Sequence, residues 1–412
     1  MANKFKALSR QEHIKSIKLA AYSTPYPENS DDENRKIVET TCDSRNAFIR
    51  DRDRIVHSES FRRLQGKTQV YVSELSPIIR NRLTHTMEVW QISVSIARML
   101  RANIHLTEAI AFGHDLGHTP FGHAGENALD NIMIESGLDG FSHNEQSVRV
   151  VSLLESKPNI TLASGQKIDS KSKSVGLNLT YATREGIFKH TDRFKNDCKN
   201  KRMYNEYKGF SDGSIEAQIV NISDEIAQRT HDLQDVWMTG AIAREDIALI
   251  FSMSPDFFGD ESFGIEKAGI SSIVGNLIND VVNASLNNLN DSFDGDPRKK
   301  RFITYSEDGA IFSSQLEKLI KKAAILGDEV NQMNSRGRHI IHSLYDISLK
   351  DPYCVPNFIK DKFRLELRKK LNDPKGYEKI SIKHNKDKRV ICDYIASLTD
   401  KEAIDIFRST LI

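Results

Sequence analysis

Apolar residues recur at three- and four-residue steps along much of this sequence, which is the pattern of α-helices with one buried face. In residues 81–100 the recurring positions are Leu83, Met87, Trp90, Val94 and Ala97. The same spacing predicts helices over residues 122–135 and from residue 215 to at least residue 233. We therefore predict a mostly α fold.

A further short helix and the long helix that begins near residue 215 carry polar residues at informative places. Thr107 is a candidate cap for a short helix that stops at Gly117 and delivers His114 and Asp115 at its C-terminal end. Ser214 caps the long helix that follows later, and Asp224 lies off the apolar stripe of that helix. We expect Asp224 to face a cleft.

The composition is that of a globular protein. The chain has 412 residues and 39% hydrophobic content, enough to bury a large core. Lys and Arg number 58 against 57 Asp and Glu, so no global field favours nucleic acid or an anionic membrane. The four cysteines are far apart, and no apolar run is long enough to span a membrane. We expect a cytoplasmic protein with reduced thiols.

The chain divides at polar stretches. Residues 25–33, 157–176 and 192–213 are predicted loops, and a stretch rich in Gly, Asn and Asp covers residues 287–301. We predict an N-terminal segment over residues 1–34, a catalytic core over 35–290 and a helical C-terminal region over 291–412. A strand-like run at residues 301–305 stands near the start of that last region.

The run GHDLGHTPFGHAGE at residues 113–126 places five charged or metal-binding side chains within fourteen residues. Adjacent His114 and Asp115 offer an imidazole nitrogen and a carboxylate oxygen, a donor set that suits Mn, Fe, Mg or Zn. Two donors rarely hold a metal, and His85 and Asp224 supply one more each from predicted helices. A lone helical histidine is more often a hydrogen-bonded core residue, so the prediction depends on all four residues together.

Other polar residues suit acid–base chemistry and phosphate binding. His123 and Glu126 are three apart in the first turn of a predicted helix, so their side chains can meet. Arg82 lies one turn before His85, where its planar guanidinium can bind two phosphate oxygens together. Lys67 adds a second cation, and the neutral amide of Gln69 suits a sugar hydroxyl or a base edge.

Two further observations bear on phosphate binding. The alternating Arg and Asp residues at positions 50–54 are compatible with a salt-bridged surface and with phosphate contacts. The sequence has neither GxGxxG nor GxxxxGK[ST], which removes the Rossmann and P-loop ways of holding nucleotide phosphates.

Together these segments resemble the HD-domain deoxynucleoside triphosphate triphosphohydrolases, specifically the deoxyguanosinetriphosphate triphosphohydrolase-like proteins of bacteria. The matching segments span about residues 35–407 and comprise residues 50–58, 61–70, 81–89, 114–126, 141–147, 176–186, 216–224 and 393–400. The resemblance implies a mostly α HD-domain fold with a helical C-terminal extension. One departure concerns position 228, where many members have tyrosine and this chain has Gln228.

The resemblance also implies roles for individual residues. The metal ligands would be His85, His114, Asp115 and Asp224, which agrees with the set read from the residues. His123 and Glu126 would form the catalytic pair, with His143 as a further active-site histidine. Arg82 would contact phosphate, and Gln69 would lie near the sugar or base.

The activity that the resemblance implies is hydrolysis of a deoxynucleoside triphosphate between the α-phosphorus and the 5′ oxygen. The expected cofactor is Mn²⁺ or Mg²⁺, with Fe, Co, Ni or Zn also compatible. A second nucleotide that activates the enzyme and a hexameric assembly are further expectations. Alternatives are an HD-type phosphatase or phosphodiesterase, and a nucleotide or nucleic-acid sensor with little turnover. The complete His123 and Glu126 pair favours the triphosphohydrolase.

Overall fold

The computed structural model describes residues 9–29, 33–69, 80–156, 160–162, 164–168, 175–189, 205–207, 212–238, 240, 242–243, 245–246, 265–326, 328–372, 380 and 382–410. The predicted mostly α fold is confirmed. The N-terminal half contains α1 (Arg10–Ser16), α2 (Ala47–Val56), α3 (Glu59–Arg63), η1 (Leu64–Gly66), α4 (Arg82–Met99), α5 (Ile104–Gly113), α6 (Gly122–Glu135), α7 (His143–Arg149), η3 (Val150–Leu154) and α9 (Tyr181–Lys189).

The second half is also helical. It contains α12 (Ile215–Met238), α15 (Ile265–Ser292), α16 (Glu307–Leu326), α17 (Asp328–Lys350), η4 (Pro352–Cys354), α18 (Asn357–Lys360), α19 (Leu365–Leu371), α20 (Asn385–Ser397) and α21 (Asp400–Ser409). Strands β1 (Ile160–Thr161) and β2 (Lys167–Ile168) form a small antiparallel pair, with Ile160 opposite Ile168.

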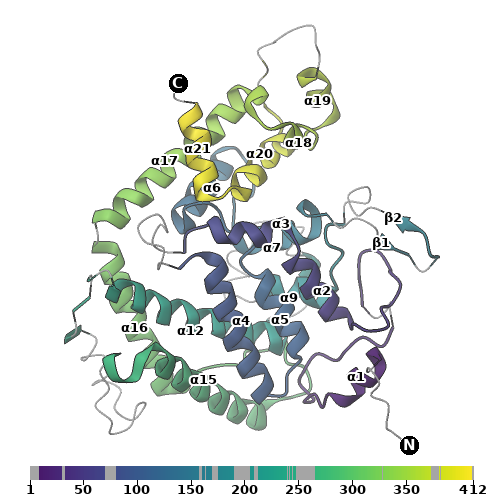
Figure 1. Ribbon diagram of the computed structural model, residues 1–412, viewed down its shortest axis with the longest axis vertical. Coiled ribbons are helices and arrows are strands. Elements are labelled where there is room, and N and C mark those ends of the chain that lie inside the picture. Colours follow the sequence, from purple (N-terminus) through teal and green to yellow (C-terminus); the bar gives the residue numbers. More distant parts are fainter. Residues whose placement is uncertain are drawn as a thin grey trace, which may run out of the picture.

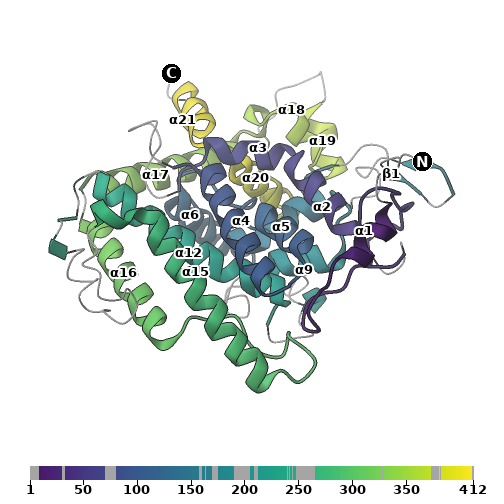
Figure 2. The same ribbon diagram turned by 60° about the horizontal axis from the view of Figure 1, so that its bottom comes forward.

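The helices are arranged around α4, α5 and α12, which pack against one another in the middle of the molecule (Figure 1). Helices α15 and α16 lie along one edge of this group. Helix α17 leads from that edge to α18–α21 at the opposite end, where α17 and α20 contact α6. The view in Figure 2 separates the α15 and α16 edge from the C-terminal helices.

The buried apolar residues form three clusters. The first joins α4, α5, α12, α15 and α16, and the third fills the space between α2, α5, α7 and α9. The second cluster combines Leu129, Ile132 and Met133 of α6 with residues of α17, α20 and α21. Helix α6, which carries His123 and Glu126, therefore shares its core with the C-terminal region.

Several predicted helices have their expected bounds. Helix α4 begins after Asn81, whose side chain accepts a hydrogen bond from the backbone N–H of Thr84, and α6 covers residues 122–135. In α12 the predicted apolar stripe is buried, and Ser214 accepts from the N–H of Ala217. Asp224 lies off that stripe as predicted. Its side chain is 32% exposed, whereas the residues of the stripe are buried.

Other predictions were wrong in detail. Asn103, not Thr107, caps α5, because its side chain accepts from the N–H of Leu106 while the Thr107 hydroxyl bonds back to the Asn103 carbonyl. The helix also ends at Gly113 and not at Gly117, so His114 and Asp115 follow its last turn. On α4 the predicted stripe included Met87, which is 42% exposed. Residues such as Val89 and Ile96 are buried instead, because α4 packs against several helices at once.

Two segments differ from their predicted conformation. The strand-like run at residues 301–305 pairs with no strand in the described part of the chain, and the N–H groups of Phe302 and Ile303 donate to the side-chain oxygen of Gln218. The predicted loop over residues 157–176 contains the β1 and β2 pair, and its remaining residues lie partly outside the described ones. Most of the predicted loop at 192–213 also lies outside them.

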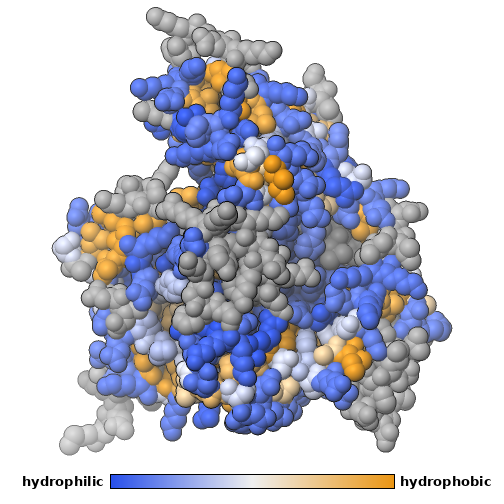
Figure 3. All heavy atoms as spheres, turned by 180° about the vertical axis from the view of Figure 1, so that it is seen from behind, coloured by the Kyte–Doolittle hydropathy of each residue, from blue (hydrophilic) through white to orange (hydrophobic). Residues whose placement is uncertain are grey.

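The surface of the described part is largely polar. In the view of Figure 3, hydrophilic residues cover most of the coloured surface and hydrophobic ones gather in separate patches. Among the helices that the structure describes, none is both long enough and apolar enough to cross a membrane.

Candidate active site

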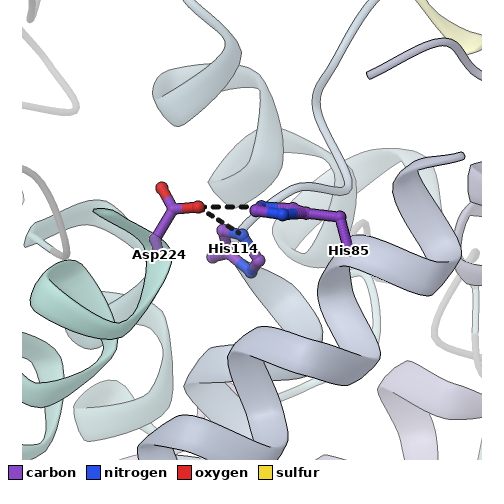
Figure 4. A group of neighbouring side chains, drawn as sticks. All are labelled: His85, His114 and Asp224. Carbon is purple, nitrogen blue, oxygen red and sulfur yellow. Dashed lines mark hydrogen bonds and ion pairs between the residues drawn. The ribbon is translucent and has the colours of Figure 1, made fainter. Parts of the chain in front are cut away.

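Three side chains from three helical segments meet at the centre of the molecule (Figure 4). His85 comes from α4, His114 follows α5 and Asp224 comes from α12. The Nε2 atom of His85 lies 2.8 Å from Oδ1 of Asp224, and Nε2 of His114 lies 3.8 Å from the same oxygen. One nitrogen or oxygen atom from each residue lies within 4.8 Å of the others, a spacing that a metal ion could occupy.

The donor chemistry of this group fits a divalent metal. The Nδ1 atom of His114 lies 2.6 Å from the carbonyl oxygen of Ala111, so Nδ1–H donates to that carbonyl and the lone pair is on Nε2. That lone pair faces the carboxylates of Asp224 and Asp115. Backbone hydrogen bonds of this kind fix the orientation of metal-ligating histidines. His85, His114 and Asp224 could therefore hold an ion.

Asp115 lies beside this group and connects it to its surroundings. Its Oδ1 atom is 3.4 Å from Nε2 of His114 and 3.0 Å from Nε2 of His118. Its Oδ2 atom accepts a hydrogen bond of 3.0 Å from Nη1 of Arg82, whose side chain is almost completely buried. Asp115 therefore has one oxygen toward the histidines and the other toward Arg82.

The electrostatics favour ionised carboxylates at this site. Burial opposes ionisation of Asp224, but the hydrogen bond from His85 and the nearby His114 outweigh burial and lower the pKa of the carboxyl. Burial likewise opposes ionisation of Asp115, whereas His114, His118 and Arg82 hold its pKa well below the usual value. Two carboxylates and two buried imidazoles thus converge, and the charge of a cation would suit them.

A second group of side chains adjoins the first on the far side of Asp115. Oε1 of Glu126 accepts from the N–H of His143 and from its ring Nδ1, each at 2.8 Å. Oε2 of Glu126 lies 3.4 Å from Nδ1 of His123. The rings of His143 and His118 are stacked with their centres 3.9 Å apart. The structure therefore brings together His118, His123, Glu126 and His143.

Solvent access and pKa differ within this second group. His123 is 63% exposed, whereas His118 is buried and its Nδ1 has no hydrogen-bond partner among the described residues. Burial and the charge of Arg82 hold the pKa of His118 well below the usual value. Burial opposes charge on both Glu126 and His143. Their mutual contact nevertheless lowers the pKa of Glu126 and raises the pKa of His143. A Glu126 carboxylate therefore orients a readily protonated His143.

The backbone between the two groups is shaped by glycines and close packing. A Cβ at Gly117 would overlap the backbone of His143 and Ser147, so only glycine allows α7 to approach the loop after α5. Phe121 and Gly122 have φ values of 62° and 56°, so the turn before α6 uses two left-handed residues in succession. Glycine adopts this conformation readily, whereas it is strained for phenylalanine.

The predicted substrate-binding residues fall into two environments. The backbone carbonyl of Gln69 passes next to Gly122, and Nη2 of Arg82 lies on the same side of that turn. The side-chain Oε1 of Gln69 is buried without a hydrogen-bond partner among the described residues. Lys67 is completely buried, and its ammonium donates to the backbone carbonyls of His118 and Ala396. Lys67 is therefore joined to the site through backbone.

The alternating run at residues 50–54 forms ion pairs within the protein. Arg50 and Arg54 both contact Glu39, and Arg52 contacts Glu108. Asp51 contacts Arg35 at 2.5 Å. The ion pairs of the salt-bridged interpretation are present, but Arg50 and Asp51 are buried, so the run is not the exposed surface that this interpretation implied.

The sequence pattern indicated no role for two residues near His85, His114 and Asp224, the three residues that we call the metal group. His118 lies inside the conspicuous run at 113–126, and its contact with Asp115 became visible only in three dimensions. Asp232 lies two turns after Asp224 on α12, and that spacing was the available signal. Its Oδ1 is buried with no hydrogen-bond partner among the described residues, and burial raises the pKa of its carboxyl to about 7.

Known proteins resemble this chain along most of its length. Residues 82–228 match the HD domain, and residues 303–409 match the phosphohydrolase-associated domain. A deoxyguanosinetriphosphate triphosphohydrolase-like protein of Geobacter sulfurreducens is 33% identical, and the alignment covers 97% of each chain. A protein of the same name from Wolinella succinogenes is 35% identical over 89% of this chain and 95% of the relative.

These similarities agree with the site. The HD domain match includes His85, His114, Asp115 and Asp224, and HD domains are metal-dependent. A third relative of the same name, from Azoarcus sp., is 34% identical over 94% of this chain. The chain therefore belongs to the deoxyguanosinetriphosphate triphosphohydrolase-like family of HD-domain phosphohydrolases.

Proposed function

We propose that this protein hydrolyses deoxynucleoside triphosphates such as dGTP to a deoxynucleoside and inorganic triphosphate. The observation that carries the proposal is the pair of adjoining side-chain groups on either side of Asp115. Its Oδ1 lies 3.4 Å from Nε2 of His114 in one group and 3.0 Å from Nε2 of His118 in the other. A phosphoryl group bound beside the first group would lie within reach of proton donors and acceptors in the second.

The first group would hold a divalent ion, with Mn²⁺ or Mg²⁺ as the preferred ions. His85, His114, Asp115 and Asp224 are its proposed ligands. Such an ion supplies Lewis-acid charge next to the phosphoryl oxygens. Arg82 and Lys67 are the nearby cations, and Arg82 is the one that we assign to substrate phosphate because its Nε is buried without a hydrogen-bond partner among the described residues.

The second group would carry out proton transfer. In the proposed reaction a water oxygen bonds to the α-phosphorus, and the bond from that phosphorus to the 5′ oxygen breaks. The 5′ oxygen is a poor leaving group and needs a proton. His123 is exposed to solvent and close to Glu126, and His143 is held by the same carboxylate, so these histidines are positioned to give or take that proton.

Substrate selection would depend on residues next to these groups. Gln69 offers an amide near the turn at Gly122, which suits a sugar hydroxyl or base edge. Asp232 adds a buried acceptor on α12. An activating nucleotide at a second site and a hexameric assembly remain predictions from the family.

The test is product analysis with purified protein and Mn²⁺ or Mg²⁺. Each dNTP is supplied alone and in pairs, and the products are separated by chromatography. We expect inorganic triphosphate and deoxynucleoside in equal amounts. Release of orthophosphate or pyrophosphate instead would favour the other HD phosphatases and phosphodiesterases. A lack of turnover with all substrates would favour a nucleotide sensor.

Arg82→Lys tests the proposed phosphate contact. The variant keeps the positive charge but loses the planar fork that binds two oxygens. We expect unchanged metal content and a larger loss of kcat/KM with a triphosphate than with a small phosphodiester. Equal losses on both substrates, or loss of the metal, would show that Arg82 acts through its hydrogen bond to Asp115.

A further inference from the structure

The segment DYIASLTD at residues 393–400 lies far from the HD motifs in sequence but next to them in space. It covers the last part of α20 and the first residue of α21. Figure 1 shows these two helices beside α6, and α20 contacts α6 directly. Asp393 and Asp400 of the segment contact the elements that carry the second active-site group, and Ala396 is connected to them through Lys67. We call these three residues the C-terminal clamp.

Asp400 holds the turn that precedes α6. Its Oδ1 accepts a hydrogen bond of 2.9 Å from the backbone N–H of Phe121, and its Oδ2 accepts one of 3.0 Å from the N–H of Thr68. The Thr68 hydroxyl also donates to Oδ2. Phe121 is the strained left-handed residue of that turn, and Gly337 of α17 lies so close to it that no Cβ would fit there.

Ala396 is connected to the same loop through the side chain of Lys67. Its carbonyl oxygen accepts a hydrogen bond of 2.8 Å from the ammonium of Lys67. The same ammonium donates to the carbonyl of His118, so one buried cation connects α20 with the loop that carries His118. Buried Lys67 therefore has a structural role, because it joins the backbone of α20 to the backbone of the loop at His118.

Asp393 holds α7, the helix that begins with His143. Its Oδ1 accepts 2.8 Å and 3.2 Å hydrogen bonds from Nε of Arg149 and Nε2 of Gln146. Its Oδ2 accepts a bond of 2.6 Å from Nη2 of Arg149. Arg389 of α20 contacts both Asp393 and the side-chain oxygen of Gln146. Burial opposes ionisation of Asp393, but the charges of Arg149 and Arg389 outweigh burial and lower the pKa of its carboxyl.

We propose that the C-terminal clamp positions His118, His123, Glu126 and His143 relative to the metal group, so that the C-terminal region is part of the active-site machinery. Asp400 sets the start of α6, and Asp393 sets the start of α7. These are positioning residues, because neither lies among the side chains of the two active-site groups. This proposal rests on the proposed function in one respect only, which is that those four residues take part in proton transfer.

The chemistry of the contacts explains why aspartate is needed. The contacts that we describe for both carboxylates come from N–H or O–H donors. An asparagine at either place turns one oxygen into a donor, so one side loses its hydrogen bond and meets another donor. A displacement of about 1 Å at catalytic groups can cost about 10²-fold in rate.

The test compares Asp400→Asn and Asp393→Asn with two matched controls. Asp387→Asn alters a buried aspartate on α20 that accepts from Arg364, and Asp405→Asn alters an exposed aspartate on α21. For each variant we would measure kcat, KM, bound metal, thermal stability and the hydrogen exchange of peptides over residues 118–126 and 143–149.

We expect Asp400→Asn to speed exchange in the 118–126 peptide and Asp393→Asn to speed it in the 143–149 peptide. Each should lower kcat about 10- to 10²-fold with a nearly constant KM and full metal content. Asp387→Asn should lower stability with little change in kcat, and Asp405→Asn should change neither. If Asp400→Asn does not fold, Thr68→Val removes one of its donors, and we expect a smaller effect in the same direction.

The proposal is overturned if Asp387→Asn reduces kcat as much as the clamp variants do at equal loss of stability. Unchanged kcat in both clamp variants, or exchange that speeds up equally in both peptides, would also overturn it. If the wild-type protein hydrolyses a different phosphate ester, the proposed substrate is wrong and kcat on that ester still tests the clamp. If no ester is hydrolysed, the hydrogen exchange of the 118–126 and 143–149 peptides in the two clamp variants decides whether the clamp positions these segments.

Discussion

Asp224 and His123 have the most exposed side chains of the two active-site groups. His85 and His114 are buried, while the side chain of Asp224 is 32% exposed and that of His123 is 63% exposed. The buried histidines are held rigidly by packing, while Asp224 and His123 remain accessible from solvent. The separation of the two groups allows metal binding and proton transfer to be tested independently at single residues.

His85→Ala should remove the metal, and His123→Ala should not. His85 contributes one of the few donors of the metal group, so its loss leaves the ion weakly held. His123 lies in the other group, and its loss should lower turnover by about 10² or more at full metal content. Metal analysis and single-turnover rates check both variants. Stoichiometric metal in His85→Ala, or activity within a few-fold of wild type in His123→Ala, would contradict the assignment.

Asp232 makes the stability of the metal-free protein depend on pH. The unfolded chain ionises this carboxyl at about pH 4, whereas burial raises its pKa to about 7 in the folded protein. The folded state thus holds an extra proton between those values, and its stability falls as pH rises through them.

Asp232→Asn removes that ionisation. The variant should gain stability over wild type, and the gain at pH 8 should exceed the gain at pH 5.5 by about 2 kcal/mol. Urea unfolding of metal-free protein at the two pH values measures the difference. An equal gain at both would mean that Asp232 is not a buried carboxyl of raised pKa.

The sequence predicted the residue types of the site better than their contacts. His114, Asp115 and Glu126 stand out because polar residues gather within fourteen positions. The connection of Asp115 to His118, and the use of Lys67 as a bridge between backbone carbonyls, depend on segments that approach only in the folded protein. No local pattern records such approaches, so these contacts could not be predicted.

At the scale of elements, periodicity predicted where helices lie better than it predicted how they pack. Helix α12 has one apolar stripe that is buried as expected, because one side of it faces the core. Helix α4 is surrounded by α5, α12 and α15, so its buried residues extend beyond a single stripe. The cap of α5 was missed because two competent residues, Asn103 and Thr107, lie one turn apart.

Two glycine substitutions should have opposite effects on stability. Gly117→Ala places a methyl against the backbone of His143 and Ser147, so α7 must move, at a cost of about 1–3 kcal/mol. Gly275→Ala lies in α15, where no described residue lies within 4 Å of the added methyl, and should stabilise that helix by about 0.5–1 kcal/mol. Urea unfolding measures both changes. A stable, fully active Gly117→Ala protein would show that α7 need not approach this loop so closely.

At the scale of the whole molecule, the apolar clusters cross the boundary between the two matched domains. The HD domain match ends at residue 228 and the phosphohydrolase-associated match begins at residue 303. Leu129 and Met133 of α6 belong to the first match but are buried among residues of α17 and α20. The C-terminal region therefore completes a core that begins in the HD domain.

This shared core leads to the last prediction, which concerns cooperativity. If α6 loses its core when the C-terminal helices unfold, the two regions should unfold together. Calorimetry should then show one transition whose calorimetric and van't Hoff enthalpies agree. If the proposed metal binds the folded site and not the unfolded chain, metal at about 100 times its Kd should add about 2.7 kcal/mol and shift that whole transition upward. A separate low-temperature transition that metal leaves in place would instead mean that the C-terminal helices unfold independently, and that α6 keeps its structure without them.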